Sequence, residues 1–165
     1  MKEENVIIRF AKEEELEQVN KIRKQVHTLH CDGRTDIFKT GGWDDIKDVV
    51  NERFASEEGG VIVACVGEKI VGAAVVQFVH KPESAFQQAR DFYHVEEFGV
   101  DEEYRRRGIA TLLIDFMKKD AMERGFKKIE LDMWEFNETA LRFYESVGFM
   151  TYRRALELGL RPNGV

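Results

Sequence analysis

The sequence predicts an α/β fold with a mixed, mostly antiparallel central sheet, one parallel pair of strands and about four helices on its faces. Short apolar runs of strand character alternate with longer runs of helical period along the chain. Two of the strand-like runs flank Gly67–Lys69, which has the length and chemistry of a hairpin turn. Further on, two strand-like runs enclose a helical run, and the whole has the length of a crossover between parallel strands.

Size and composition indicate one globular domain over residues 1–165. The chain is 43% hydrophobic and 34% charged, and its net charge of -6 argues against a protein that covers phosphates on nucleic acid. The first ten residues lack the apolar stretch of a signal peptide, and no run approaches the ~18 uncharged residues of a membrane span. Cys31 and Cys65 have no paired spacing, so we expect free thiols in a cytoplasmic protein.

The first half of the chain predicts a strand, two helices and a hairpin. Residues 5–10 carry a β-branched run, and apolar residues at helical spacing follow on both sides of a loop at residues 31–42. The hairpin joins residues 60–66 to residues 70–79. A polar connection at residues 81–90 has room for one helical turn. The apolar positions of the two helices are Leu16, Val19, Ile22, Val26 and Leu29, then Ile46, Val49, Val50 and Phe54.

The second half predicts strand, helix, strand, helix, strand. The first strand ends near Val100, and the helix after it stops at Gly125, a residue favoured just past a helix end. Residues 129–133 alternate as a half-buried strand, parallel to the one that ends near Val100. Asn137 is a good N-cap for a helix that closes at Gly148, and residues 149–158 indicate a last strand.

The turn between the strand and the first of these helices concentrates unpaired backbone N–H groups and the positive end of the helix dipole. Gly108 and Ala110 leave room for a bulky diphosphate, and three arginines add positive charge. The turn is Arg105, Arg106, Arg107, Gly108, Ile109, Ala110 and Thr111. Alternatively, the arginines form a solvated turn opposed to the acids at 101–103. The turn lacks GxGxxG and GK[ST], so neither nucleotide fingerprint fits.

Two segments carry a resemblance to a known family. Val100-Asp101-Glu102-Glu103-Tyr104-Arg105-Arg106-Arg107-Gly108-Ile109-Ala110 is similar to the R/Q-x-x-G-x-G/A acyl-CoA signature of the GCN5-related N-acetyltransferase family. Residues 137–149, NETALRFYESVGF, resemble the family's second conserved block in order and spacing. The likeness covers roughly residues 92–158. It implies an acetyl-CoA-binding half there and an acceptor-side half over residues 1–91.

The resemblance implies where acetyl-CoA binds as cosubstrate. The two parallel strands splay apart, and Phe98, Gly99 and Val100 contact the pantetheine arm and acyl carbonyl through backbone groups, one N–H acting as oxyanion donor. The turn at 105–111 holds the pyrophosphate, and Asn137 contacts the cosubstrate as well as capping its helix. Alternatively, Gly99 is an ordinary weak point in a strand.

The resemblance also implies a proton donor and, less specifically, a base. Tyr144 lies where the family approaches the cofactor sulfur and donates a proton to the departing thiolate; alternatively it is a core tyrosine bonded to a backbone carbonyl. Alternation puts Glu96 and Glu97 on opposite faces of the strand, so at most one points into the acceptor site. We expect Glu96 to take the amine's proton, usually through water, with His94 as the alternative.

The acceptor is the least determined part of the prediction. Acids and overall negative charge favour a cationic primary amine, and we expect a small-molecule amine rather than a protein or peptide. The sequence does not distinguish acetyl from larger acyl groups as the group that is transferred. A metal site at His27, His30 and Cys31 is disfavoured, because no further ligand lies nearby in sequence. The alternative function is an acyl-CoA-sensing module without turnover, and nucleic-acid binding is the least favoured function. The resemblance also suggests a possible homodimer.

Overall fold

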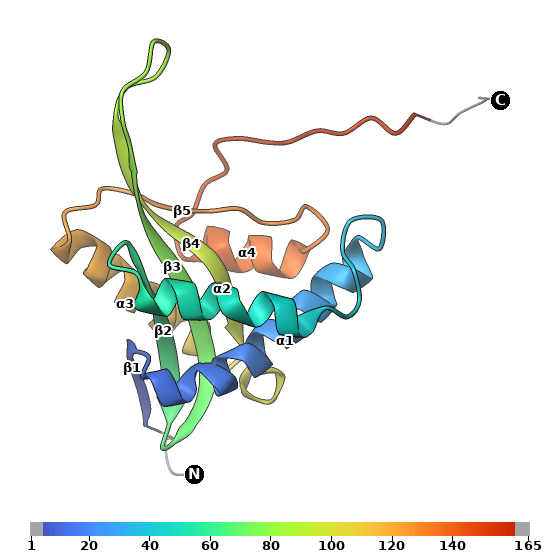
Figure 1. Ribbon diagram of the computed structural model, residues 1–165, viewed down its shortest axis with the longest axis vertical. Coiled ribbons are helices and arrows are strands. Elements are labelled where there is room, and N and C mark those ends of the chain that lie inside the picture. Colours follow the sequence, from blue (N-terminus) through green and yellow to red (C-terminus); the bar gives the residue numbers. More distant parts are fainter. Residues whose placement is uncertain (1–4, 161–165) are drawn as a thin grey trace.

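The computed structural model describes residues 5–160, apart from the side chains of residues 44 and 45, and shows one five-stranded sheet (Figure 1). The strands lie across the sheet in chain order. Their bounds are β1 Val6–Phe10, β2 Gly59–Val66, β3 Lys69–Lys81, β4 Arg90–Val100 and β5 Ile129–Leu131. The pairs β1–β2, β2–β3 and β3–β4 are antiparallel, and the pair β4–β5 is parallel, which confirms the predicted mixed sheet.

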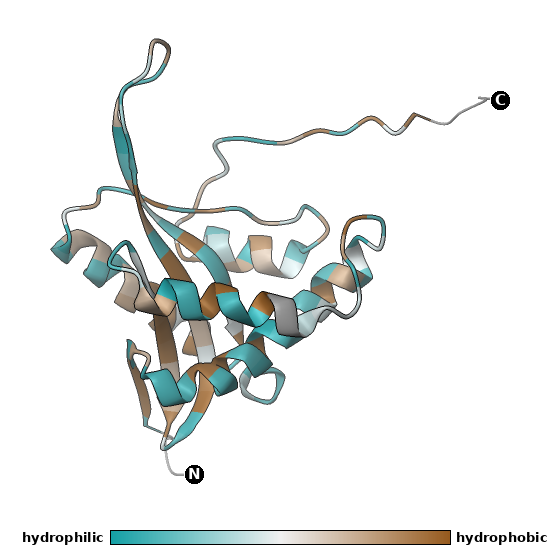
Figure 2. Ribbon diagram, in the orientation of Figure 1, coloured by the Kyte–Doolittle hydropathy of each residue, from teal (hydrophilic) through white to brown (hydrophobic). Residues whose placement is uncertain are grey.

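Four α-helices within residues 5–160 cover the two faces of this sheet, as predicted. They are α1 Leu16–Gly33, α2 Trp43–Ala55, α3 Ile109–Glu123 and α4 Glu138–Ser146, with short 3-10 helices η1 Glu13–Glu15 and η2 Glu102–Tyr104. α1 and α2 bury one face and α3 the other, so the central strands are apolar on both sides (Figure 2). In β2, Ile62 joins the α3 core, whereas its neighbour Val63 joins the α1–α2 core.

The parallel pair is short. Only three β4 residues, Tyr93, His94 and Val95, are paired with β5. From residue 97 to Val100, β4 is hydrogen-bonded to β3 alone. The carboxyl-terminal half of β4 is therefore open on its β5 side, and the two strands separate just where the turn into α3 begins.

Three expectations about the connections need correction. Residues 149–158 do not form a strand: the chain beyond α4 runs out from the body without sheet partners among the described residues (Figure 1). Residues 82–89 hold no helical turn but close a long β3–β4 hairpin, with the Ser84 hydroxyl accepting from the Gln87 N–H at 3.1 Å. β5 ends at Leu131 rather than at 133, because the residues that follow enter a turn before α4.

Candidate active site

The strand-to-helix turn is open to solvent. Arg105, Arg106, Arg107 and Gly108 are all exposed, while Ile109 anchors α3 in the core at 2% exposure. The Leu112 N–H is bonded to the Gly108 carbonyl at 3.1 Å, so the three helix amides before it precede the first intrahelical bond. The turn thus presents free N–H donors at the positive end of a fifteen-residue helix.

Gly108 gives this turn its shape. Its φ of +79° lies in the left-handed region that favours glycine, and a Cβ built on it meets no atom within 4 Å. Arg106 has a φ of +63°, so two of the seven turn residues depart from ordinary backbone. The space above Gly108 is therefore available to a ligand, because the side chains of the turn do not fill it.

The arginines beside Gly108 are held by backbone groups and by an aromatic ring. Arg105 Nε donates to the Val100 carbonyl at 3.2 Å, which ties the turn to the end of β4. Arg107 Nη2 donates to the Glu103 carbonyl at 3.0 Å and its guanidinium lies 4.7 Å from the Tyr104 ring centroid. These contacts fix where the positive charge of the turn lies.

Glu96 and Glu97 lie on the same face of the sheet, which corrects the prediction that alternation separates them. A β-bulge interrupts the β3–β4 register at this point: Val75 pairs with Glu97 and Val76 with Val95, leaving Glu96 as the extra residue. Glu96 accepts from Arg53 of α2 at 2.7 and 2.8 Å. Glu97 accepts from Nε and Nη2 of Arg23 of α1.

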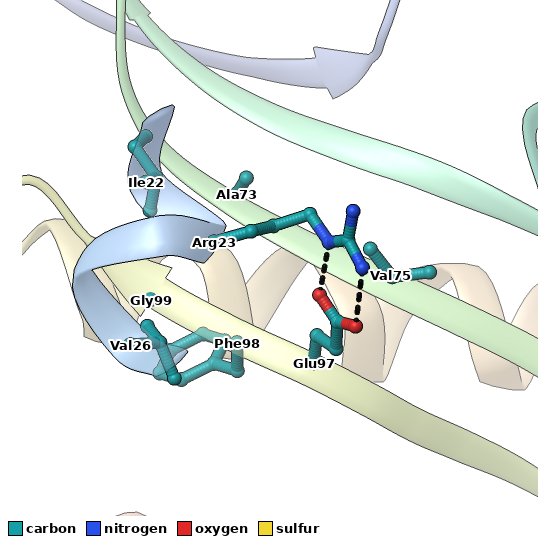
Figure 3. A pocket seen from close by; sticks show the side chains of 8 residues that line it. All are labelled: Ile22, Arg23, Val26, Ala73, Val75, Glu97, Phe98 and Gly99. Atoms are coloured by element: carbon teal, nitrogen blue, oxygen red, sulfur yellow. Dashed lines mark hydrogen bonds and ion pairs between the residues drawn. The ribbon is translucent and has the colours of Figure 1, made fainter. Parts of the chain in front are cut away.

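Arg23 uses its donors to join three elements. Nη2 donates to Glu97 at 2.8 Å (Figure 3). Nη1 donates to the Asn20 side chain and to the Ile46 carbonyl of α2, each at 2.8 Å. Its side chain is only 6% exposed. α1, α2 and β4 are therefore locked together immediately beside the bulge.

Gly99 faces α1 at a close approach. A Cβ there would lie 2.6 Å from Val26 Cγ2 and 3.2 Å from Ile22 Cγ2, so a larger residue fits only if the Val26 side chain or the helix shifts. Ile22, Val26 and Gly99 line the same small hollow between α1 and β4 as Glu97 and Phe98 (Figure 3). Close packing of α1 on β4 therefore requires glycine at position 99. On the unpaired edge of β4, the groups available to a ligand are those of the backbone.

Tyr144 lies on the opposite side of β4 from the two glutamates. Its ring centroid is 6.1 Å from that of Phe98 and 5.6 Å from that of Phe149. Burial raises the pKa of Tyr144 to about 12, which keeps the hydroxyl protonated at neutral pH. Among the described residues none forms a hydrogen bond with this hydroxyl, so the alternative of a core tyrosine bonded to a carbonyl does not hold.

Asn137 caps α4 as predicted. Its Oδ1 accepts from the Ala140 N–H at 3.1 Å, and its own N–H donates to the Trp134 carbonyl at 2.9 Å. The cap places the start of α4 directly after the β5–α4 loop. The structure thus brings Tyr144, Phe98 and Asn137 to one side of the sheet, near the separated ends of β4 and β5.

A family model decides the relationship to known proteins. The model of the acetyltransferase (GNAT) family matches residues 23–149, most of the chain. The chain belongs to the GNAT family. The match begins in α1 and includes the turn at Gly108 and the α4 segment, so it covers both motifs on which the resemblance rests.

Individual GNAT-fold proteins show the same likeness. A tetramutant of the BH1408 protein from Bacillus halodurans is 30% identical, with a TM-score of 0.88, over 93% of this chain and 99% of that one. Aminoglycoside N-acetyltransferase AAC(6')-Iy, solved in complex with CoA, shares the fold at 18% identity, with a TM-score of 0.75 over 95% of each chain. L-ornithine N5-acetyltransferase NATA1 of Arabidopsis thaliana is 27% identical over 108 residues, 66% of this chain; the match spans 43% of that relative.

An aromatic band connects two loops of this GNAT domain. His30 stacks on Phe38 with ring centroids 5.2 Å apart, and Phe38 meets Trp134 edge-on at 5.2 Å. Trp134 in turn stacks on Phe136 at 6.4 Å. The band therefore joins the α1–α2 loop to the β5–α4 loop, two segments about a hundred residues apart in the chain.

Trp134 and Phe136 are members of this band that the sequence pattern does not predict. They lie in a loop without periodicity, and their only signal was their position just before the Asn137 cap.

Burial, with a contribution from His27, lowers the pKa of His30, so the His30 ring is neutral at neutral pH. In the described residues no three His, Cys, Asp or Glu side chains gather into a metal site.

His94 lies on β4, one pair before the bulge. Its Nδ1 is a buried nitrogen without a hydrogen-bond partner in the described structure. A buried polar atom in that state is uncommon, because leaving it unpaired costs free energy.

Within residues 5–160, no helix has the length and apolar character needed to cross a membrane.

Proposed function

We propose that this GNAT-family protein is an N-acetyltransferase that moves an acetyl group from acetyl-CoA to a primary amine by direct attack. The observation that carries the proposal is the conjunction of the open turn at Gly108 with the separation of β4 from β5. A turn of free amides suits a diphosphate, and an unpaired strand edge suits the amide-containing arm attached to it. The turn residues 105–111 hold the pyrophosphate, and Phe98, Gly99 and Val100 offer backbone groups to the arm.

Tyr144 serves as the general acid. As the amine nitrogen bonds to the acyl carbon, a backbone N–H of β4 donates to the carbonyl oxygen, where negative charge develops. The carbon–sulfur bond then breaks, and the Tyr144 hydroxyl gives its proton to the departing sulfur. Two features support this role: burial keeps the hydroxyl protonated and available to the sulfur, and no described residue forms a hydrogen bond that competes for it.

The proton released by the amine goes to Glu96 through water. Both Glu96 oxygens accept from Arg53, but each keeps a second lone pair with which a water can bond. His94, with its unpartnered Nδ1, is the alternative acceptor of that proton.

A small cationic amine is the favoured acceptor. Glu96 and Glu97 lie on the α1–α2 face, and the aromatic band offers ring faces to a cation. The relative NATA1 is named for ornithine, whose N5 is such an amine, and the solved relative AAC(6')-Iy is an aminoglycoside acetyltransferase. We therefore place small-molecule amines ahead of protein or peptide amines.

The remaining aspects of the proposal concern setting and assembly. We propose a cytoplasmic protein, which its two free, buried cysteines suit, and a homodimer. With a net charge of -6, nucleic acid is a disfavoured partner.

Steady-state release of CoA thiol tests the activity. Purified protein with acetyl-CoA and a panel of ornithine, polyamines, aminoglycosides and an N-terminal peptide should release CoA with at least one small amine. Binding of acetyl-CoA without release for any member of the panel would overturn the enzyme proposal and favour the acyl-CoA-sensing module.

A matched pair of variants separates the candidate bases. If Glu96 accepts the proton, Glu96→Gln should lower kcat about 10²-fold while His94→Gln leaves it within about threefold. The reverse pattern would assign the role to His94.

A further inference from the structure

A second cleft lies at the far end of α3 from the Gly108 turn. It has a volume of about 220 Å³ and is bounded by the last turns of α3, the loop that follows and the start of β5. Its apolar lining is Ala121, Met122, Phe126 and Ile129. At 1.5 Å per residue, α3 places this cleft about 20 Å from the Gly108 turn. The two sites are therefore separate.

The apolar wall of this cleft is rigid on one side and uncovered on the other. The Phe126 ring packs into the core, with its centroid 5.8 Å from that of Phe78. The Phe126 N–H donates to the Ala121 carbonyl at 2.9 Å, and the Gly125 N–H donates to the Met122 carbonyl at 3.0 Å, which closes the helix end. Met122 itself is 69% exposed. The cleft thus has a preformed wall and an apolar surface that no described residue covers.

Three lysines line the same cleft: Lys118 of α3, and Lys127 and Lys128 of the loop before β5. Lys118 Nζ donates to the Val147 carbonyl at 2.9 Å, which holds its ammonium group beside the end of α4. An ammonium group has three N–H donors, so two remain for another acceptor. Within residues 5–160, no carboxylate forms an ion pair with any of the three lysines.

The acidic residues of the last two turns of α3 are engaged with other groups. Asp120 accepts from Arg124 Nε at 2.9 Å and from the Tyr93 hydroxyl at 3.0 Å. Glu123 lies 3.8 Å from Lys119 Nζ in an i,i+4 pair. The cleft therefore keeps a local positive charge, although the chain has a net charge of -6.

We propose that this cleft binds a small amphipathic carboxylate. The apolar chain lies on Met122, Phe126 and Ile129, and the carboxylate accepts hydrogen bonds from the three lysines. A volume of 220 Å³ corresponds to about seven water molecules, which suits a chain of medium length such as that of octanoate. Burial of the chain supplies affinity and the lysines select an anion. The site uses neither the Gly108 turn nor the acetyl-transfer chemistry.

A chemical-shift titration of the full chain with octanoate tests the site. Amides of residues 118–129 should shift, and those of residues 105–111 should not. Because each buried CH₂ contributes up to about fourfold in affinity, octanoate should bind at least tenfold more tightly than butanoate. It should also bind at least tenfold more tightly than 1-octanol, which has the same chain length without the charge.

Paired charge variants separate the lysines of the cleft from charge in general. Lys127→Gln with Lys128→Gln should weaken octanoate binding at least tenfold and leave 1-octanol binding within twofold. Lys21→Gln with Lys24→Gln removes the same charge from exposed positions of α1 and is the matched control. Its affinity for octanoate should stay within twofold of that of the wild-type chain.

Four results would overturn the proposal. The first is the absence of octanoate binding at millimolar concentration, and the second is equal affinity for octanoate and 1-octanol, which would show an apolar surface without anion recognition. The third is displacement of octanoate by saturating acetyl-CoA together with shifts at residues 105–111, which would place the anion at the Gly108 turn. The fourth is binding to phosphatidylglycerol vesicles without binding of octanoate, which would assign the lysines to a membrane surface.

Discussion

Arg23 of α1 and Glu97 of β4 form a two-bond ion pair in which the arginine is almost completely buried. The pair exists because the bulge at Glu96 turns Glu97 toward the helices instead of away from them. It joins α1 to the strand whose other edge is open beside β5. Its geometry therefore links the two halves of the proposed site.

Removal of Arg23 should destabilise the fold. Arg23→Met leaves the Glu97 carboxylate and the Ile46 carbonyl without their donor, and we expect a loss of about 2–4 kcal/mol in the free energy of unfolding. Urea denaturation measures it. Arg142→Met removes the exposed pair with Glu138 and should change stability by less than about 0.5 kcal/mol. Equal effects of the two substitutions would show that the Arg23 pair is not structural.

Loss of the Tyr144 hydroxyl should lower turnover without lowering stability. Tyr144→Phe removes no hydrogen bond made by described residues, so the unfolding free energy should change by less than about 1 kcal/mol, while kcat falls about 10²-fold or more. Because the pKa of Tyr144 is about 12, the hydroxyl stays protonated below that pH and should cause no alkaline loss of rate up to pH 10. Tyr152→Phe is the control. Unchanged kcat in Tyr144→Phe would remove the general acid.

A side chain at Gly99 should push α1 away from β4. Gly99→Ala places a methyl group 2.6 Å from Val26 Cγ2, and such overpacking costs about 1–3 kcal/mol. The double variant Gly99→Ala with Val26→Ala should recover part of that loss, since the clash is gone. Thermal unfolding of four proteins, the wild type, Gly99→Ala, Val26→Ala and the double variant, forms a double-mutant cycle. Strictly additive losses would place the cause elsewhere.

The Arg9–Glu15 pair should contribute stability that disappears in acid. Arg9 donates two hydrogen bonds to Glu15, at 2.8 and 2.5 Å, and lowers the pKa of Glu15 from 4.5 to about 2. A lowered folded pKa gives stability that is complete above pH 4.5 and is lost as the pH falls toward 2. Glu15→Gln should therefore lower Tm by about 1–3 °C at pH 7, and the difference should shrink below pH 4. A difference independent of pH would exclude the ion pair as its source.

The sequence allows the elements and the phosphate turn to be predicted because each carries a local signal. α3 has an apolar stripe, Asn137 is a cap, and Gly108 lies between a strand and a helix. The bulge at Glu96 has no such signal, since it depends on how β3 and β4 align, and it reversed the predicted separation of the two glutamates. Trp134 and Phe136 come together with Phe38 of the α1–α2 loop and His30 of α1 only in the folded chain, because these residues are distant in the sequence. Residues 149–158 have the pattern of a strand but form none, because a strand also needs a pairing partner, which the pattern does not specify.

Calorimetric titration with acetyl-CoA tests the central claim, that the amides around Gly108 hold the diphosphate. Gly108→Val fills the space that a Cβ would enter freely, and Gly67→Val, at φ +60° in the β2–β3 turn, introduces the same kind of backbone strain away from the site. We predict that Gly108→Val weakens acetyl-CoA binding at least tenfold while Gly67→Val stays within twofold of the wild-type protein. Equal affinity in all three proteins, or no binding by the wild-type chain at millimolar acetyl-CoA, would contradict the account.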